Sequence, residues 1–515
     1  MKKKMISALL VAAMVITTIT GCGNAATTTS NDSAEATTAE SGEKILKTAA
    51  SFAYASLDVH KDYYGWYTSI YGVSEALFKM NENSEAVPCL AEDATVDGNV
   101  WTITIKKEAA FANGTNLTAD MVKRNLERVA EVNERFAFVD DFTIDVVDDK
   151  TLTITTQEAY PTLKNDLASP EFGMIDLDAT TDFDNDPICT GPFVMKEFNP
   201  EGDVTVARND NYWGKDVYLD GAVFYYMQDD DTKLMAMQSG EIDCYNSVSS
   251  AAMEIYNADP DTYNVVSIPG ARLQFYILNE NRLDASVREA INLTVDKDAV
   301  ASYLSGTVSA AVGPFGTNTA YGKVTGPVVD TAKAVELIEA DGYTKGADGF
   351  YEKDGQKLTV NICYYAARSL DTIALLMQEQ LKAVGIDSTL TCEEDPDATY
   401  LTTGDFDIAL YCMIADKCGD PLYFINSTIA SDAVYNVGGF KSDEAQAMVE
   451  ELRGEQDTAR RAELANKIVQ IAIDDNAFGY VGLFNNTTVL RKGVSGFAEN
   501  VPFDFYGIDA NTRME

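Results

Sequence analysis

The chain has 515 residues, 46% of them apolar and 23% charged, which is typical of folded domains and argues against a disordered, collagen-like or coiled-coil chain. Asp and Glu outnumber Lys and Arg by 81 to 39, a net charge of −42, which argues against nucleic acid as a partner because affinity for its phosphates depends on Lys and Arg. The single histidine, His60, excludes zinc motifs that need two.

The N-terminus predicts export and attachment to a membrane surface. A basic start is followed by an uncharged apolar run of about 16 residues, too short to span a bilayer, so residues 1–21 read as a signal peptide. The tetrad Ile19-Thr20-Gly21-Cys22 resembles a bacterial lipobox, which implies lipidation of Cys22. Residues 22–43 lack core-forming side chains and are predicted to be a flexible tether. We expect the protein at the extracellular face of the cytoplasmic membrane, held only by its lipid.

The first half of the folded region mixes strands and helices. Alternating apolar residues predict strands at 100–105, 151–155, 204–207 and 222–227. Apolar residues 122, 126 and 129 have helical spacing, and Thr118 is the expected N-cap. A second helix is predicted after Asp230 or Asp231, ending at Gly240.

In the second half, strands and helices alternate. Strands are predicted at 358–362, 386–390 and 406–411, with an amphipathic helix at 370–384 that ends at Gly385. Asp420-Pro421 is typical of a helix start. Alternation of this kind predicts an α/β lobe with parallel strands.

Seven cysteines follow Cys22, and an odd number argues against a complete disulfide framework in an exported protein. We therefore expect mostly free thiols, with a Cys412–Cys418 bridge as the alternative. The absence of any Cys-x-x-Cys pair argues against a thiolate metal site, and we predict no metal site.

Six segments, in order along the chain, resemble the family 5 extracellular solute-binding proteins of ABC importers, which serve oligopeptides, dipeptides, nickel and metal chelates. The matching segments are Trp101–Gly114, Leu117–Val122, Thr190–Phe193, Arg208–Gly214, Ser239–Asp243 and Val287–Ile291 with Asp296-Lys297. One such motif is weak evidence, but six in the family's order are highly specific. The likeness spans essentially Lys44 to Phe505.

The resemblance implies an α/β fold with two lobes, of the periplasmic-binding-protein type (type II, cluster C), with an extra subdomain in lobe I. It places lobe I at 44–271 with the subdomain at about 76–189, lobe II at 272–480 and a C-terminal return to lobe I at 481–515. A ligand binds between the lobes and favours their closure, and a permease recognises the closed form. No bond is made or broken, so the resemblance implies a monomeric receptor without catalytic residues or cofactor.

The resemblance also suggests ligand-binding residues. Asp416 matches the aspartate that holds a peptide's α-ammonium, and Arg368 lies in a loop that can hold a carboxylate in the dipeptide type. Arg135 and Phe138 match a segment that contacts metal chelates in the nickel type. No histidine follows His60, so a nickel–histidine chelate in that family's known manner is not expected.

An aromatic loop near the N-terminus could line the cleft, by packing or by cation–π contacts. Its members are Tyr63, Tyr64, Trp66 and Tyr67. The sequence thus predicts a lipid-anchored receptor that delivers a small peptide to an ABC importer. A nickel or opine-like metallophore is the alternative ligand, and an extracellular hydrolase is the alternative from another class.

Overall fold

One sheet of eleven strands runs through the computed structural model, which describes residues 43–498 and 501–515. The predicted signal peptide, most of the tether and the lipidation site Cys22 lie outside the described residues. Ten strands form a continuous path, and β13 (Val308–Ala310) pairs with β20 beside it. In spatial order the ten are β18 (Asp387–Cys392), β17 (Thr359–Tyr364), β19 (Ile408–Ile414), β12 (Tyr263–Leu278), β20 (Phe478–Arg491), β11 (Cys244–Asn246), β1 (Ile45–Ala50), β10 (Gly221–Tyr226), β9 (Val204–Arg208) and β8 (Phe193–Phe198).

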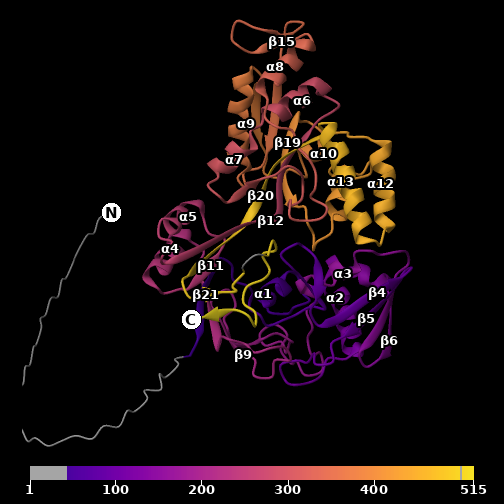
Figure 1. The fold of residues 1–515 in the computed structure, drawn as a ribbon, viewed down its shortest axis with the longest axis vertical. Helices are drawn as coiled ribbons and strands as arrows, with labels where there is room; N and C mark the ends of the chain where they lie inside the picture. The colour runs from indigo at the N-terminus through magenta and orange to yellow at the C-terminus, as the bar shows by residue number, and fades with distance from the viewer. Residues whose placement is uncertain (1–42, 499–500) are drawn as a thin grey trace, which may run out of the picture. The chain divides into compact units, whose positions relative to one another are not determined.

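Two strands of this sheet, β12 with 16 residues and β20 with 14, are much longer than the others. They pair in antiparallel fashion over nearly their whole length (Figure 1). The register shifts between Pro269 and Leu273, and again after Gln274. Such irregularities bend and twist a strand pair, so the crossing strands are locally distorted around Arg272.

Buried apolar side chains form separate cores on the two sides of this distortion. Two cores draw on residues 273–483, whereas three others draw almost entirely on residues before 271 and after 488. We therefore place lobe I at residues 43–271 and 485–515, and lobe II at residues 272–484.

Lobe II is an α/β layer in which β17 pairs in parallel with both β18 and β19. This arrangement confirms the parallel strands that the sequence predicted. A small sheet of β14 (Thr344–Lys345), β15 (Tyr351–Lys353) and β16 (Gln356–Lys357) lies at its far end. Its helices are α6 (Ala285–Thr294), α7 (Lys297–Tyr303), α8 (Thr331–Ala340), α9 (Leu370–Val384), α10 (Tyr400–Thr403), α11 (Leu422–Phe424), the π-turn Ile425–Ile429, α12 (Asp443–Gly454) and α13 (Thr458–Asp474).

Lobe I carries a second, antiparallel sheet of four strands that packs on α2 (Ala119–Val132). In spatial order these strands are β4 (Ala91–Asp97), β5 (Val100–Ile105), β7 (Thr151–Thr155) and β6 (Thr143–Asp148). The remaining elements are α1 (Tyr64–Ile70), β2 (Phe78–Met80), β3 (Ala86–Pro88), α3 (Leu163–Asp166), α4 (Asp230–Ser239), α5 (Ser250–Asn257), β21 (Val494–Ser495), β22 (Arg513–Met514) and the 3-10 turns Glu134–Asp141 and Pro170–Phe172.

Local sequence signals placed most of these elements well. The Thr118 side chain caps α2 by accepting from the Met121 amide at 3.3 Å, as predicted. The predicted cap of α4 is wrong by at least one residue, because the side chain of Asp229 accepts the Thr232 amide at 2.8 Å. Cys412 and Cys418 are not joined by a disulfide, so the alternative Cys412–Cys418 bridge is wrong. Among the same residues, no helix is both long and apolar enough to cross a membrane.

Candidate functional site

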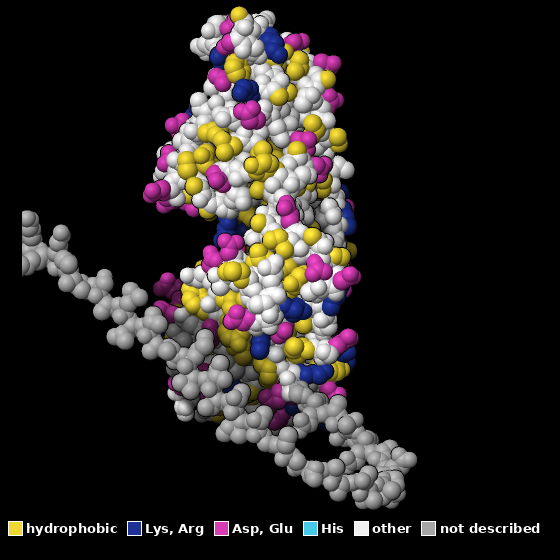
Figure 2. Space-filling model, turned by 90° about the vertical axis from the view of Figure 1, so that its left-hand side faces the viewer, with side chains coloured by type: hydrophobic (Ala, Val, Ile, Leu, Met, Phe, Trp, Pro, Cys, Tyr) yellow, Lys and Arg dark blue, Asp and Glu magenta, His cyan; other side chains and the backbone are white. Residues whose placement is uncertain are grey.

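A cavity of about 440 Å³ lies between the lobes, where β12 and β20 cross. Lobe I lines it with the first turn of α1 and the 3-10 turn at Pro170, and lobe II with the loop from Ile414 to Tyr423. The distorted part of β12 and the facing part of β20 also contribute to its wall. A space-filling view from the side shows a notch between the upper and lower halves, with Lys or Arg side chains visible in it (Figure 2).

Two arginines on the cavity wall, Arg272 and Arg368, make no ion pair with any described residue within 4.0 Å. Arg272 projects from the distorted segment of β12, and Arg368 comes from the loop between β17 and α9. The two arginines lie near the same residue, Tyr365. Burial raises the pKa of Tyr365 to about 12, and the charges of Arg368 and Arg272 oppose this rise. The sequence analysis identified Arg368 but missed Arg272.

A third arginine, Arg135, is already partnered. Its Nη1 lies 3.3 Å from Oε1 of the fully buried Glu171, and its guanidinium lies 4.1 Å from the centre of the Tyr63 ring. Tyr63 itself is 54% exposed and lines the cavity. Arg135 and Tyr63 therefore form one face of the cavity in lobe I, held by a buried carboxylate behind them.

Asp416, from the lobe II loop, also lines the cavity and is buried. Its two carboxylate oxygens accept from the Tyr321 hydroxyl at 2.8 Å and from the Gly419 amide at 2.7 Å. Burial raises the pKa of this carboxyl to about 6, although these two bonds and a contact with Ser84 oppose the rise. Because a carboxylate accepts up to about four hydrogen bonds, Asp416 retains room for a further donor from the cavity.

The remaining predicted residues are divided between the cavity and the protein interior. Trp66 lines the cavity and donates its indole N–H to the Asp504 carbonyl at 3.3 Å. Tyr67 faces a smaller adjoining pocket of about 180 Å³. Phe138 packs among the subdomain rings Phe136, Phe142 and Tyr160, and neither it nor Tyr64 lies on the wall of the cavity.

His60 has a structural role beneath the aromatic loop. Its Nδ1 accepts from Arg128 at 2.9 Å and its Nε2 donates to the Gly173 carbonyl at 3.0 Å, so the ring is neutral. Arg128 also grips Asp58 through two bonds of 2.8 and 2.6 Å. Burial, followed by the charge of Arg128, lowers the pKa of His60 to about 4. With both nitrogens engaged, His60 has no lone pair for a metal ion.

The other charged groups on the wall were not identified from the sequence. Lys417 makes no ion pair with the described residues and lies 5.5 Å from the centre of the Tyr423 ring. Asp504 comes from the C-terminal segment, and burial raises the pKa of its carboxyl, with Arg272 and Arg368 opposing the rise. No group of three or more His, Cys, Asp or Glu side chains in the described residues is placed to hold a metal ion.

Comparison with known proteins agrees with this architecture. The model for bacterial extracellular solute-binding proteins, family 5 middle, matches residues 85–436. The chain belongs to this family. It is 25% identical to the nickel-binding protein NikA of Staphylococcus aureus, covering 86% of this chain and 89% of that protein. It is 23% identical to the dipeptide-binding protein DppE of Bacillus subtilis, covering 89% and 90%.

The fold of the family 5 proteins is also found here. The crystal structure of the nickel ABC transporter protein from Bacillus halodurans aligns with a TM-score of 0.85 at 25% identity, covering 92% of this chain and all of that chain. The predicted α/β fold with two lobes is therefore confirmed, and so is the assignment to a family of extracellular solute-binding proteins of ABC transporters. This family consists of binding proteins and not of enzymes.

Proposed function

We propose that this family 5 protein captures a small solute with free carboxylate groups in the cavity between its lobes and presents it to an ABC importer. The observation that carries the proposal is the unpaired Arg272 and Arg368. In a chain with 81 acidic side chains, two neighbouring cations that make no ion pair within 4.0 Å form a local region that attracts anions, although Asp504 lies near both and offsets part of their charge. Arginine's planar fork binds carboxylates through two parallel hydrogen bonds.

A small peptide is the first candidate for this solute. Its C-terminal carboxylate would meet Arg272 and Arg368, and its α-ammonium would meet Asp416, which also lines the cavity. Asp416 already accepts from Tyr321 and Gly419 and contacts Ser84, so a ligand ammonium would be a further donor within the capacity of a carboxylate. A charge-assisted contact of this kind is strong in a closed, water-poor cavity.

A metal chelate is the second candidate, and two observations favour it. The described residues offer no cluster of side chains that could coordinate a metal ion, so a metal would have to bind as a complex with a chelator. Two adjacent arginines also suit a chelator with several carboxylates better than a single carboxylate. An opine-like metallophore has this chemistry, as does the nickel substrate class named for the relative in Staphylococcus aureus.

We further propose that the mature protein is a monomer anchored through lipid on Cys22, on the tether that residues 22–43 supply. Two or three acyl chains hold a protein stably on a bilayer, whereas one chain binds only marginally. Globomycin treatment of the producing cells, followed by mass analysis of the N-terminal peptide, tests this point. An unmodified Cys22 in untreated cells contradicts it.

The decisive experiment is native mass spectrometry of the protein purified without denaturation, followed by calorimetry with defined probes. The probes are tri-alanine, tri-alanine amide, nickel(II)–EDTA and aqueous nickel(II). We expect binding of tri-alanine or nickel(II)–EDTA, no binding of the amide or of aqueous nickel, and no chemical change of any probe. Turnover at substoichiometric protein contradicts the receptor function.

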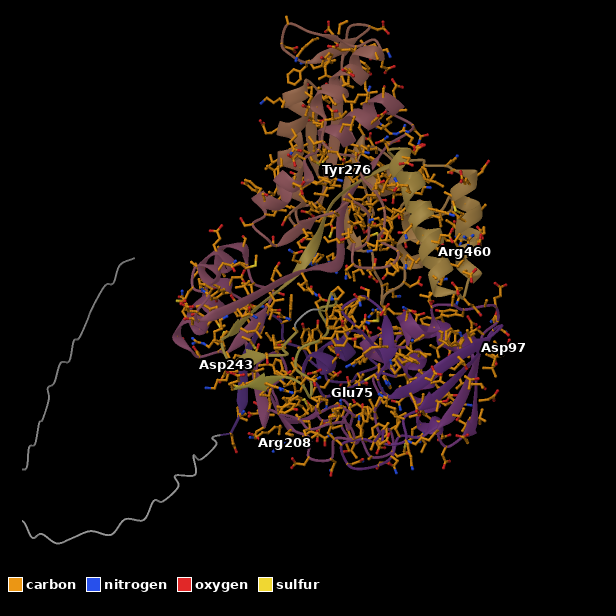
Figure 3. The ribbon with its side chains drawn as sticks, viewed as in Figure 1. Glu75, Asp97, Arg208, Asp243, Tyr276 and Arg460 are labelled. Carbon is orange, nitrogen blue, oxygen red and sulfur yellow. The ribbon has the colours of Figure 1, made fainter. Side chains whose placement is uncertain are left out.

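Single substitutions then test the arginines. Arg272→Ala and Arg368→Ala should each weaken binding of the anionic probe by at least about tenfold, as for the loss of one partner in a charged pair. Arg208→Ala is the matched control, because Arg208 lies far from the cavity in lobe I and already pairs with Asp220 at 2.8 Å (Figure 3). Equal affinities for all three variants contradict the proposed role of the cavity cations.

A further inference from the structure

The loop that carries Arg368 departs from ordinary backbone and capping rules. Arg368 and Ser369 are consecutive non-glycine residues in the left-handed region, with φ of +56° and +58°. Side chains with a Cβ rarely adopt this conformation, because the Cβ comes too close to the following carbonyl oxygen. Ser369 stands at the N-cap of α9, yet its side chain makes no capping hydrogen bond. This strained conformation therefore needs support from outside the loop.

That support comes from a buried glutamine on a crossing strand. Gln274 is 0% exposed, and its Nε2 donates to the carbonyl of Arg368 at 2.6 Å. Gln274 follows Arg272 by two positions on β12, so the strand's alternation places both side chains on one face. The strand that carries one cavity arginine thus also fixes the loop that carries the other.

Gln274 is not the residue that stability alone would select at this position. Its Oε1 is buried and has no hydrogen-bond partner among the residues that the structure describes. An unsatisfied buried amide oxygen destabilises a protein, and an unbranched apolar side chain of similar length would remove that cost. Strain at Arg368 and Ser369 together with an unsatisfied group at Gln274 is typical of a functional site.

We propose that Gln274 is a positioning residue that holds Arg368 toward the anionic group of the solute. This inference rests on the proposed function, in which Arg272 and Arg368 bind carboxylates. Gln274 does not touch the solute in this arrangement. It acts through the Arg368 carbonyl, and its amide N–H is the group required.

Gln274→Met tests the inference, with tri-alanine and nickel(II)–EDTA as probes. We expect affinity for the probe that binds to fall by about tenfold, the loss of about one charge-assisted contact. We also expect the melting temperature of the unliganded variant to be equal to or higher than that of the wild type. A purely structural role predicts the opposite, a lower melting temperature, and that result overturns the proposal.

A double-mutant cycle with Arg368→Ala separates this inference from the proposed function. If Gln274 acts through Arg368, the double variant should bind no more weakly than Arg368→Ala alone. If the two substitutions instead weaken binding by factors that multiply in the double variant, the positioning role is overturned. If Arg368→Ala leaves the binding of every probe unchanged, the proposed function fails instead.

A crystal structure of unliganded Gln274→Met completes the test without any probe. We expect Arg368 and Ser369 to leave the left-handed conformation, or the segment 366–369 to shift away from β12. A variant in which Arg368 keeps the wild-type backbone and the same guanidinium position overturns the proposal, whatever the binding data show.

Discussion

Arg461 offers a sharp test of how lobe II stabilises the loop at the cavity. Its side chain lies on α13 and is buried, and its Nε and Nη2 donate to the carboxylate of Asp420 at distances of 2.6–3.0 Å. Its Nη1 donates to the carbonyls of Leu452 and Glu455 at 2.7 and 2.9 Å. Asp420 in turn accepts the Leu422 amide at 2.8 Å. We expect Arg461→Met to leave Asp420 charged, buried and without its cation.

The expected loss follows from that burial. Removing one partner of a buried ion pair costs about 3–5 kcal/mol, chiefly because the other charge stays desolvated. The substitution also removes the donor of two backbone carbonyls. We therefore expect Arg461→Met to lower the free energy of unfolding by about 4 kcal/mol, near the middle of this range. Its sequence neighbour Arg460 is a natural control, because it forms exposed pairs with Glu451 and Glu463 at 2.7 and 2.9 Å. Arg460→Met should have only a small effect, since exposed ion pairs stabilise little.

Urea unfolding followed by circular dichroism measures both variants. A second substitution, Asp420→Asn, in the Arg461→Met background removes the unpaired charge and should restore part of the loss. Similar small losses for Arg460→Met and Arg461→Met would refute the reasoning. Failure of Asp420→Asn to restore any stability would show that lost packing, and not the buried charge, dominates.

Three further predictions concern pH and lobe closure. The pKa of His60 is about 4 in the folded chain and about 6.5 in the unfolded chain, so acidification favours the unfolded state. From pH 7 to pH 5 the wild type should lose about 2 kcal/mol of stability through this group. His60→Gln should not show this loss when both are measured by urea unfolding at the two pH values. Burial raises the pKa of Glu75 to about 7, so this carboxyl has the opposite effect on stability. The folded state should lose stability as the pH rises from about 4.5 to 7, because the buried carboxyl then loses its proton less readily than in the unfolded chain. Glu75→Gln should make the melting temperature less dependent on pH in this range. In Gly419→Ala the new Cβ would lie 1.9 Å from the Ser84 carbonyl oxygen of lobe I, so calorimetry should show weaker ligand binding. Gly404→Ala is the control, because Gly404 has a similar φ of +69° and a Cβ there would have no neighbour within 4 Å. This variant should bind the ligand normally. Unchanged affinity of the first glycine variant, or a parallel loss in the second, contradicts the steric argument.

The sequence predicted the local elements well because their signals are local. The helix 370–384 is confirmed over its whole length, with Gly385 at φ +89° as its C-cap. Strands 100–105 and 151–155 are confirmed for the same reason, since alternation reflects burial of one face. The α4 cap is an exception, because three adjacent aspartates offer equivalent caps and only the chain path selects Asp229. The helix predicted to start at Asp420-Pro421 also begins later, at Leu422.

The cavity was only partly predictable, because it depends on contacts between distant segments. Arg368 and Asp416 were predicted from the family resemblance and Trp66 from the aromatic loop, and the structure brings all three to one cavity. Arg272 is the one charged residue in β12, but nothing in the local sequence distinguishes it from a solvent-exposed arginine. Asp504 had none, because only the return of the C-terminal segment places it beside the arginines.

Lobe I is built from two segments that are far apart in the sequence, so it cannot complete its fold until the second segment has been synthesised. Its β-sheet needs the end of β20 to pair with β11, and the short pair of β21 and β22 also comes from the last residues. Lobe II, by contrast, lies within one uninterrupted stretch of chain and can fold as soon as that stretch has been synthesised. The half that emerges first from the ribosome or a translocation channel is therefore the last to finish, and a chaperone that shields early segments would act mainly on lobe I.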